Sequence, residues 1–144
     1  MKKLILLSIL ACLFTGHLAA KGDRFVKRDE LPKDAQAFLA SFFSDSAIKT
    51  VLKESKSNDY EVVMNDGMAF DFDERGSWKE VDCNDGRVPL SIVPSKMLNV
   101  IAKTYGPVAE IIWIQRTKKG YQVELSNGVE IGFNKRYKII PLKH

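Results

Sequence analysis

A strand-turn-strand pattern occurs twice in this chain of 144 residues. The first copy, "YEVVMNDGMAFDFDERGSWKEV", spans residues 60–81, and the second, "YQVELSNGVEIGFNKRYKII", spans residues 121–140. In both copies apolar and polar residues alternate on either side of a short turn that ends in glycine. Such period-two alternation around a glycine turn predicts a β-hairpin. The chain is therefore expected to fold around two hairpins of similar design.

The turn determines the register of each hairpin. A three-residue loop with glycine in the left-handed position pairs the flanking residues outward from the loop. In the first hairpin this register places three apolar pairs on one face: Met64 with Met68, Val62 with Phe70, and Tyr60 with Phe72. The second hairpin gives Leu125 with Val129, Val123 with Ile131, and Tyr121 with Phe133. A slip of one residue would mix charged and apolar side chains on both faces, so the register is well specified.

A helix is predicted before each hairpin, at residues 31–43 and 93–105, because a proline suits the first helical turn. The apolar stripes at helical spacing are Ala35, Phe38, Leu39 and Phe42 in the first helix, and Met97, Ile101 and Tyr105 in the second. Further strands are expected at 47–54, 77–81, 110–117 and 137–141. The predicted fold is α+β, a tandem repeat of a helix plus a three- or four-stranded antiparallel sheet. One sheet face packs on the helix and the other stays open.

The expected organisation begins with a signal peptide at residues 1–20, which has two lysines, an apolar run and small residues before the cleavage point. A rival interpretation makes Cys12 a lipid-bearing residue. An N-terminal linker (21–30), a first repeat (31–82), a connector (83–92) and a second repeat (93–144) follow. No transmembrane segment is expected after signal removal, and the predicted location is periplasmic or secreted. Cys83 is then the only cysteine, so no intramolecular disulfide is expected.

Charge is divided unevenly along the chain. Residues 21–82 contain ten basic and fourteen acidic residues, whereas residues 83–144 contain ten basic and four acidic residues. An exported chain rarely meets nucleic acid, so no nucleic-acid partner is expected.

Histidine is scarce in the sequence. The only histidines are His17, within the predicted signal peptide, and His144, the last residue. The predicted mature domain therefore lacks the usual general base and the commonest zinc ligand. We therefore expect a monomer that is not an enzyme.

The acidic turn of the first copy has two interpretations. "DFDERGSWKEVD" places Asp71, Asp73 and Asp82 at positions one, three and twelve of a calcium-loop pattern, with glycine at position six. Arg75 occupies position five, where a ligand is expected, and the flanking residues are predicted strands. The other interpretation is a charged hairpin turn that keeps the sheet soluble. Calcium is therefore carried as a candidate ligand, and no other cofactor is expected.

Two tryptophans lie in predicted strands. Either Ile112 and Ile114 or Trp113 and Gln115 face the core, because periodicity alone does not decide between the two faces. If the isoleucines face inward, Trp113 lies on the open face beside Glu124. A tryptophan there, with Arg116 and Lys118 nearby, would suit a protein partner, so these four residues form the predicted partner-binding set. Trp78 is expected in the core or half-covered.

The first copy resembles the exported PepSY-like, beta-lactamase-inhibitor-like family of Bacteroidetes. The resemblance rests on Tyr60, Val62, Asn65, Gly67, Phe70, Phe72, Asp73, Gly76 and Trp78. The second copy matches at Tyr121, Val123, Asn127, Gly128, Ile131, Phe133 and Asn134, then loses the glycine and has Tyr137 in place of the tryptophan. The resemblance implies a fold like that of the beta-lactamase inhibitory protein, whose open sheet face docks on an enzyme. It implies no inhibitory residues.

The expected function is a non-catalytic exported module that recognises or inhibits a protein or peptide in the cell envelope, such as a secreted hydrolase, through the open sheet face. Addition of a peptide to the sheet edge is a second form of the same function. The alternative is a calcium-responsive periplasmic protein that uses Asp71, Asp73 and Asp82.

Overall fold

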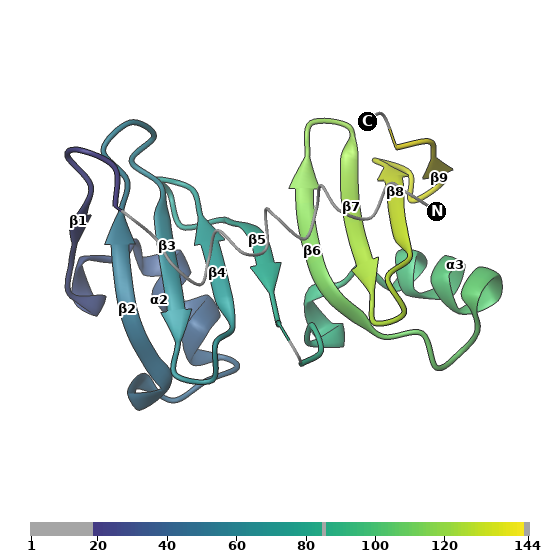
Figure 1. Cartoon of the computed structure of the whole chain (residues 1–144), viewed down its shortest axis with the longest axis horizontal. Coiled ribbons are helices and arrows are strands. Elements are labelled where there is room, and N and C mark those ends of the chain that lie inside the picture. Colours follow the sequence, from purple (N-terminus) through teal and green to yellow (C-terminus); the bar gives the residue numbers. More distant parts are fainter. Residues whose placement is uncertain (1–18, 85, 143–144) are drawn as a thin grey trace. The chain divides into compact units, whose positions relative to one another are not determined.

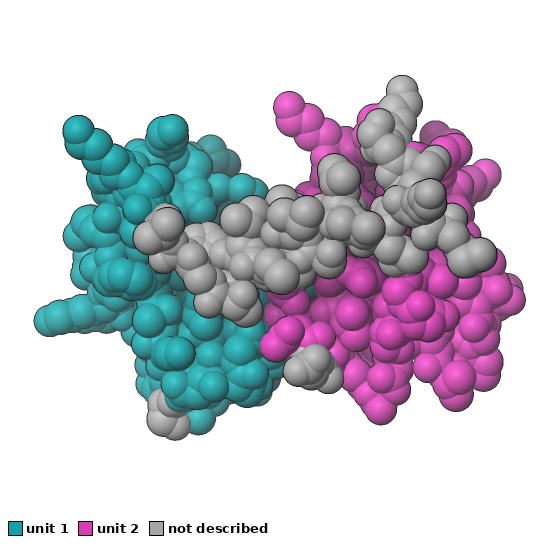
Figure 2. All heavy atoms as spheres, viewed as in Figure 1, with its two compact units in different colours: residues 1–81 teal, residues 82–144 magenta. Residues whose placement is uncertain are grey.

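The computed structural model describes residues 19–84 and 86–142. Cys12 and all but the last two residues of the predicted signal peptide lie outside these ranges. The chain divides into two compact units, of which the first ends at Val81 and the second begins at Asp82 (Figure 2). Within the described ranges, no helix is long and apolar enough to cross a membrane.

The first unit has strand order β1-β2-β3-β4-β5 (Figure 1). Its strands are β1 (Arg24–Phe25), β2 (Ile48–Lys53), β3 (Tyr60–Met64), β4 (Ala69–Phe72) and β5 (Trp78–Asp82), and its α-helix is α2 (Lys33–Ala40). Short 3-10 helices lie at Arg28–Glu30 and Asp45–Ala47. Strand β1 pairs with β2, Arg24 opposite Lys53. Residues 24–30, predicted to be linker, are therefore part of the first unit.

Helix α2 packs on the apolar face of the first sheet. The ring of Phe38 lies 6.1 Å from Phe70 and 5.6 Å from Phe72, both edge to face, and Phe43 meets Phe70 at 5.5 Å. Ala35 and Leu39 are buried, as the stripe predicted. The helix ends at Ala40, before the predicted residue 43, where the hydroxyl of Ser41 donates to the Phe38 carbonyl. Aromatic packing thus fills one face of this sheet.

The second unit has strand order β6-β7-β8-β9. Its elements are a 3-10 helix (Leu90–Ile92), α3 (Ser95–Tyr105), β6 (Ile111–Thr117), β7 (Gly120–Leu125), β8 (Glu130–Asn134) and β9 (Ile139–Ile140). Met97 and Ile101 of α3 are buried, together with Ile114, Val123, Leu125 and Phe133. Tyr105 is 37% exposed. Its predicted place in the apolar stripe is wrong, because the helix ends there at Gly106.

The predicted hairpin registers are confirmed. Tyr60 pairs with Phe72 and Val62 with Phe70 in the first unit, while Tyr121 pairs with Phe133 and Val123 with Ile131 in the second. The turn glycines have the expected left-handed backbone, with φ of 91° at Gly67 and 83° at Gly128. Trp78 is buried, as expected. Alternation and turn chemistry together were sufficient to position both hairpins.

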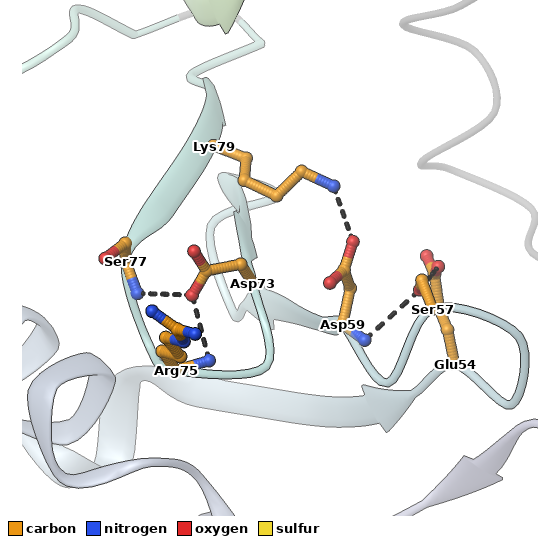
Figure 3. Close-up of polar contacts among 7 residues, drawn as sticks. All are labelled: Glu54, Ser57, Asp59, Asp73, Arg75, Ser77 and Lys79. Carbon is orange, nitrogen blue, oxygen red and sulfur yellow. Dashed lines mark hydrogen bonds and ion pairs between the residues drawn. The ribbon is translucent and has the colours of Figure 1, made fainter.

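The turns that follow the hairpins are also alike. The side chain of Asp73 accepts hydrogen bonds from the N–H groups of Arg75 and Ser77, both at 2.9 Å (Figure 3). Asn134 accepts from Arg136 and Lys138 in the same way, at 2.9 and 3.0 Å.

This match of turns changes how the two copies align. Gly76 has φ of 92° and Tyr137 has φ of 62° at the same point of the turn. Tyr137 therefore takes the place of Gly76, and Ile139 takes the place of Trp78. The predicted replacement of the tryptophan by Tyr137 is wrong, because the shared turn geometry determines the alignment.

Candidate functional site

Each sheet has a second face, opposite to the one that carries its hairpin core, and this second face is called the open face below. Side chains alternate between the two faces along a strand. In the first unit the pairs Val62–Phe70 and Tyr60–Phe72 are on the core face, so the intervening pair, Glu61 and Asp71, belongs to the open face. Two acidic side chains therefore lie directly opposite one another across β3 and β4.

The carboxyl groups around this pair act on each other. Burial raises the pKa of Asp71 to about 8, and the negative charges of Glu80, Glu61 and Glu54 add to the effect. Glu61 and Glu80 are themselves buried. Like charges in a poorly hydrated place favour the protonated form of one partner. Asp71 therefore carries a proton over much of the neutral range, and this cluster is less negative than its composition suggests.

One lysine partly compensates the acidic cluster. Lys79 on β5 forms an ion pair with Asp59 at 2.5 Å (Figure 3). The hydrogen bond between Lys79 and Asp59 raises the pKa of Lys79. The positive charge of Lys79 in turn lowers the pKa of Asp71. The ammonium group of Lys79 is therefore already paired with the carboxylate of Asp59.

The second unit replaces this acidic pair with neutral residues. Since Tyr60 corresponds to Tyr121, Glu61 corresponds to Gln122 and Asp71 to Gly132, and these two again lie directly opposite each other. Ile140 of β9 pairs with Gly132 on the other side. The same row of the open face is thus acidic in the first unit, and neutral with a missing side chain in the second.

Trp113 lies on the open face of the second unit, opposite Glu124. The register shifts between Ile111 and Trp113, so Ile111 and Ile114 both reach the core, 2% and 0% exposed. The two-residue turn at Lys118 and Lys119 decides between the two alternatives for Trp113, and the bulge brings Ile111 to the core face in place of Ile112. Trp113 is only 6% exposed, so it forms part of the floor of this surface and does not protrude from it.

The predicted partner-binding set is only partly brought together. Trp113 and Glu124 are cross-strand neighbours. Arg116 pairs with Tyr121, a residue of the core face, so it lies on the other side of β6 from Trp113. Lys118 lies in the turn after β6 and is exposed. Burial first, then the charges of Glu130 and Asp82, raise the pKa of Glu124.

The three aspartates proposed for calcium lie in different settings. Asp73 uses one side-chain oxygen to cap its own turn. Asp82 accepts a hydrogen bond from the N–H of Asn84 at 2.8 Å, and burial raises its pKa. Within residues 19–84 and 86–142, no three or more His, Cys, Asp or Glu side chains are grouped so that they could hold a metal ion. The calcium set stays a prediction.

Reasoning from the sequence missed Glu61 and Glu80 as members of the site. The signal for Glu61 was present in the hairpin register, because any pairing of Val62 with Phe70 also pairs Glu61 with Asp71. Gly132 was missed for a different reason: a single glycine in a strand gives no indication of what packs beside it.

Comparison with known proteins decides the family. Residues 58–141 match the family model described as "Putative beta-lactamase-inhibitor-like, PepSY-like". The chain belongs to this family. The resemblance noted in the sequence is confirmed, and a mixed α+β architecture accompanies it. The comparison with curated proteins gives no match.

Solved structures of the same fold come from Bacteroides. A structure described as a putative periplasmic protein from Bacteroides vulgatus has 33% identity and a TM-score of 0.79, covering 87% of this chain and 99% of its own. A second, described as a putative calcium-regulated periplasmic protein from Bacteroides thetaiotaomicron, has 33% identity and a TM-score of 0.79, covering 86% and 98%.

A third structure, a Bacteroides vulgatus periplasmic protein described as of unknown function, has 26% identity and a TM-score of 0.77, covering 85% and 100%. All three neighbours are described as periplasmic, and this PepSY-like protein is accordingly assigned to the periplasm, as its sequence predicted.

Proposed function

We propose that this PepSY-like protein is a non-catalytic periplasmic binding module, built from two copies of one unit, that recognises or inhibits a protein or peptide through its open sheet faces. The observation that carries the proposal is the composition of these faces. Cross-strand pairs on the core faces are apolar, whereas the open faces present Glu61 with Asp71 and Glu124 with Glu130, next to the pairs Val63–Ala69 and Gln122–Gly132. Polar pairs around an aromatic floor are typical of protein-recognition surfaces.

The arrangement suits recognition better than catalysis. Asp71 and Glu124, whose pKa values are raised by burial first and by neighbouring negative charges second, lie on strands β4 and β7. No histidine occurs among the described residues. Occlusion of a partner's groove by a preformed sheet requires shape and charge only, and both are supplied by rigid strands. A secreted hydrolase is one class of partner that such occlusion would inhibit.

Capture of a partner from a periplasmic extract tests the proposal. The exported chain is immobilised in three forms: wild type, Glu124→Lys with Glu130→Lys on the open face, and Lys96→Glu with Lys103→Glu on the exposed side of α3. A protein held by the wild type and the α3 variant, and lost by a still-folded open-face variant, supports the proposal. Equal capture by all three forms contradicts it.

A calcium-responsive protein is the second candidate, because one structural neighbour is described as calcium-regulated. In this chain the candidate ligands are Asp71, Asp73 and Asp82, with Glu61 opposite Asp71. Calcium prefers such carboxylate oxygens. The test is thermal unfolding with and without calcium: a rise in Tm that disappears in Asp71→Ala supports this candidate, and an unchanged Tm rejects it.

A further inference from the structure

One end of the second sheet gathers basic residues. Gly120 pairs with Thr117 of β6 and with Asn134 of β8, so the β6–β7 turn and the β8–β9 turn lie side by side at this end. Both turns are exposed and contain no acidic residue, and their basic residues are Lys118, Lys119, Lys135, Arg136 and Lys138. We call these five residues the basic end.

A hollow of about 280 Å³ adjoins the basic end. Its lining includes the polar residues Lys118, Lys119 and Gln122 and the apolar residues Ile140, Pro141 and Leu142. Gly132 lets Leu142 pack close to the sheet beside the hollow, because a Cβ atom at this position would lie 2.8 Å from Cδ2 of Leu142. A pocket of this size accommodates one or two side chains, and its lining combines cationic and apolar side chains.

The corresponding place in the first unit has a different set of charged residues. There Glu61 and Asp71 occupy the positions of Gln122 and Gly132. The loop before β3 contains Glu54, Lys56 and Asp59, whereas the shorter turn before β7 contains Lys118 and Lys119. The two units therefore present the same framework with different ligand preferences. The adjacent lysines Lys118 and Lys119 therefore favour an anionic group at the second unit, whereas the loop before β3 has no such pair of adjacent cations.

We propose that the hollow beside Lys118 and Lys119 binds an acidic peptide segment of a partner protein. One carboxylate of the segment pairs with the lysines, and a neighbouring apolar side chain packs on Ile140, Pro141 and Leu142. This inference rests on the proposed function and names the chemistry of the partner. Glu124 and Glu130 lie farther along the same face, so the acidic groups of the segment must be concentrated at the basic end.

A peptide fits this hollow better than a lipid surface does. A membrane binds to a protruding basic surface, where each lysine reaches the headgroups independently. Here two lysines flank a recess that also has an apolar wall of side-chain size. Combined recognition of a charge and an apolar side chain within a recess is the pattern expected for a short peptide segment.

A titration followed by two-dimensional amide NMR tests the inference. The probe is the peptide acetyl-Leu-Glu-Glu-Leu-Glu-Glu-amide, added to the exported chain at low salt, with a peptide containing Lys for Glu as its counterpart. We expect saturable shifts at residues 117–122, 132, 140 and 142, and binding about tenfold weaker in 0.5 M salt because screening reduces charge attraction. The lysine peptide should produce no such shifts.

Matched variants identify the lysines that matter. Lys118→Ser with Lys119→Ser should weaken peptide binding by at least about fivefold, while Lys96→Ser with Lys103→Ser removes the same charge from exposed positions of α3 and should change it less than twofold. Absence of the shifts, equal loss in both variants, or binding of phosphatidylglycerol vesicles without binding of the peptide overturns the inference. If the peptide fails while open-face capture persists, only this inference falls and the proposed function stands.

Discussion

Glu61 faces Asp71 directly across strands β3 and β4. Hairpin register alone brings the two acids together, since both adjoining cross-strand pairs are apolar and belong to the core face. Burial and the nearby negative charges raise the pKa of Asp71 to about 8. The first unit therefore has a protonated carboxyl group, that of Asp71, on its open face over much of the neutral pH range. The corresponding pair in the second unit, Gln122 and Gly132, contains no carboxyl group.

The raised pKa of Asp71 predicts that stability falls as the pH rises. The folded chain binds this proton more tightly than the unfolded chain, whose ordinary pKa is 3.8. The stabilisation is complete below about pH 4 and is lost as the pH rises through about 8. Asp71→Asn should flatten this dependence and raise the stability at pH 8.5. The measurement is the free energy of unfolding in urea between pH 5 and 8.5. In the wild type it should fall as the pH rises, by less than about 1.4 kcal/mol per pH unit, which is the largest slope that one titrating group can produce.

Asp66→Asn is the matched control for this pH dependence. Asp66 caps the hairpin turn by accepting from the N–H of Met68, and Asn127 makes the same contact in the second unit. The control should therefore retain the wild-type slope. An Asp71→Asn chain with that same slope would show that Asp71 titrates normally.

Gly76 should tolerate substitution poorly. Its φ is 92°, and an added Cβ would lie 2.8 Å from both the Ala35 nitrogen and the Pro32 Cβ at the start of α2. Gly76→Ala should destabilise the chain by about 2–3 kcal/mol, since backbone strain and a clash act together. Gly106→Ala separates the two causes, because Gly106 has φ of 100° and nothing within 4 Å of an added Cβ. Thermal unfolding should show the larger loss of Tm for Gly76→Ala; similar losses would mean that the contact with α2 contributes nothing.

Asp73 acts as a turn cap, so asparagine should replace it. Asn134 makes the same two hydrogen bonds in the second unit. Asp73→Asn should change the free energy of unfolding by less than about 0.5 kcal/mol, while Asp73→Ala should cost about 1–2 kcal/mol. Chemical denaturation of the three chains without calcium measures both differences. If asparagine proves as costly as alanine, the negative charge of Asp73 is what matters, and a cation site gains support.

The aromatic cluster of the first unit should carry much of its stability. Phe70 is fully buried and meets the rings of Phe38, Phe43 and Phe72. Phe70→Ala should cost about 3–5 kcal/mol, because the truncation leaves a cavity as well as losing buried apolar surface. Phe25 is 66% exposed, and Phe25→Ala should cost less than about 0.5 kcal/mol. Equal changes in the midpoint of denaturation would contradict this account of the core.

Much of the fold could be predicted because the decisive signals were local. The glycine turns and period-two alternation gave both hairpin registers, and the proline positions indicated where the helices begin. Strand β1 could not be predicted, since two residues are too few to show a period. The left-handed backbone at Tyr137 could not be predicted either, because a tyrosine does not indicate a turn. This conformation follows from the hydrogen bonds by which Asn134 caps the turn.

The candidate site was harder to predict because it depends on contacts between strands. Periodicity does not give the length of the β6–β7 turn, and this length decides which face Trp113 occupies, because the register runs unbroken from the pair Thr117–Gly120 to the pair Trp113–Glu124. The bulge beyond Trp113 then brings Ile111 to the core face. Arg116 was assigned to the surroundings of Trp113 from its nearness in the sequence, and the register places it on the other side of the strand. Side chains that act together across a sheet are identified by register, and one extra residue changes it.

Site-specific photo-crosslinking in the periplasm tests the central claim most directly. A photoreactive amino acid is placed at Gln115, which lies on the open face two residues beyond Trp113, or at Lys103, which is exposed on α3. The account predicts a defined protein adduct from position 115 and none from position 103 after illumination of intact cells. Adducts from position 103 alone, or the same adducts from both positions, would contradict recognition through the open sheet face.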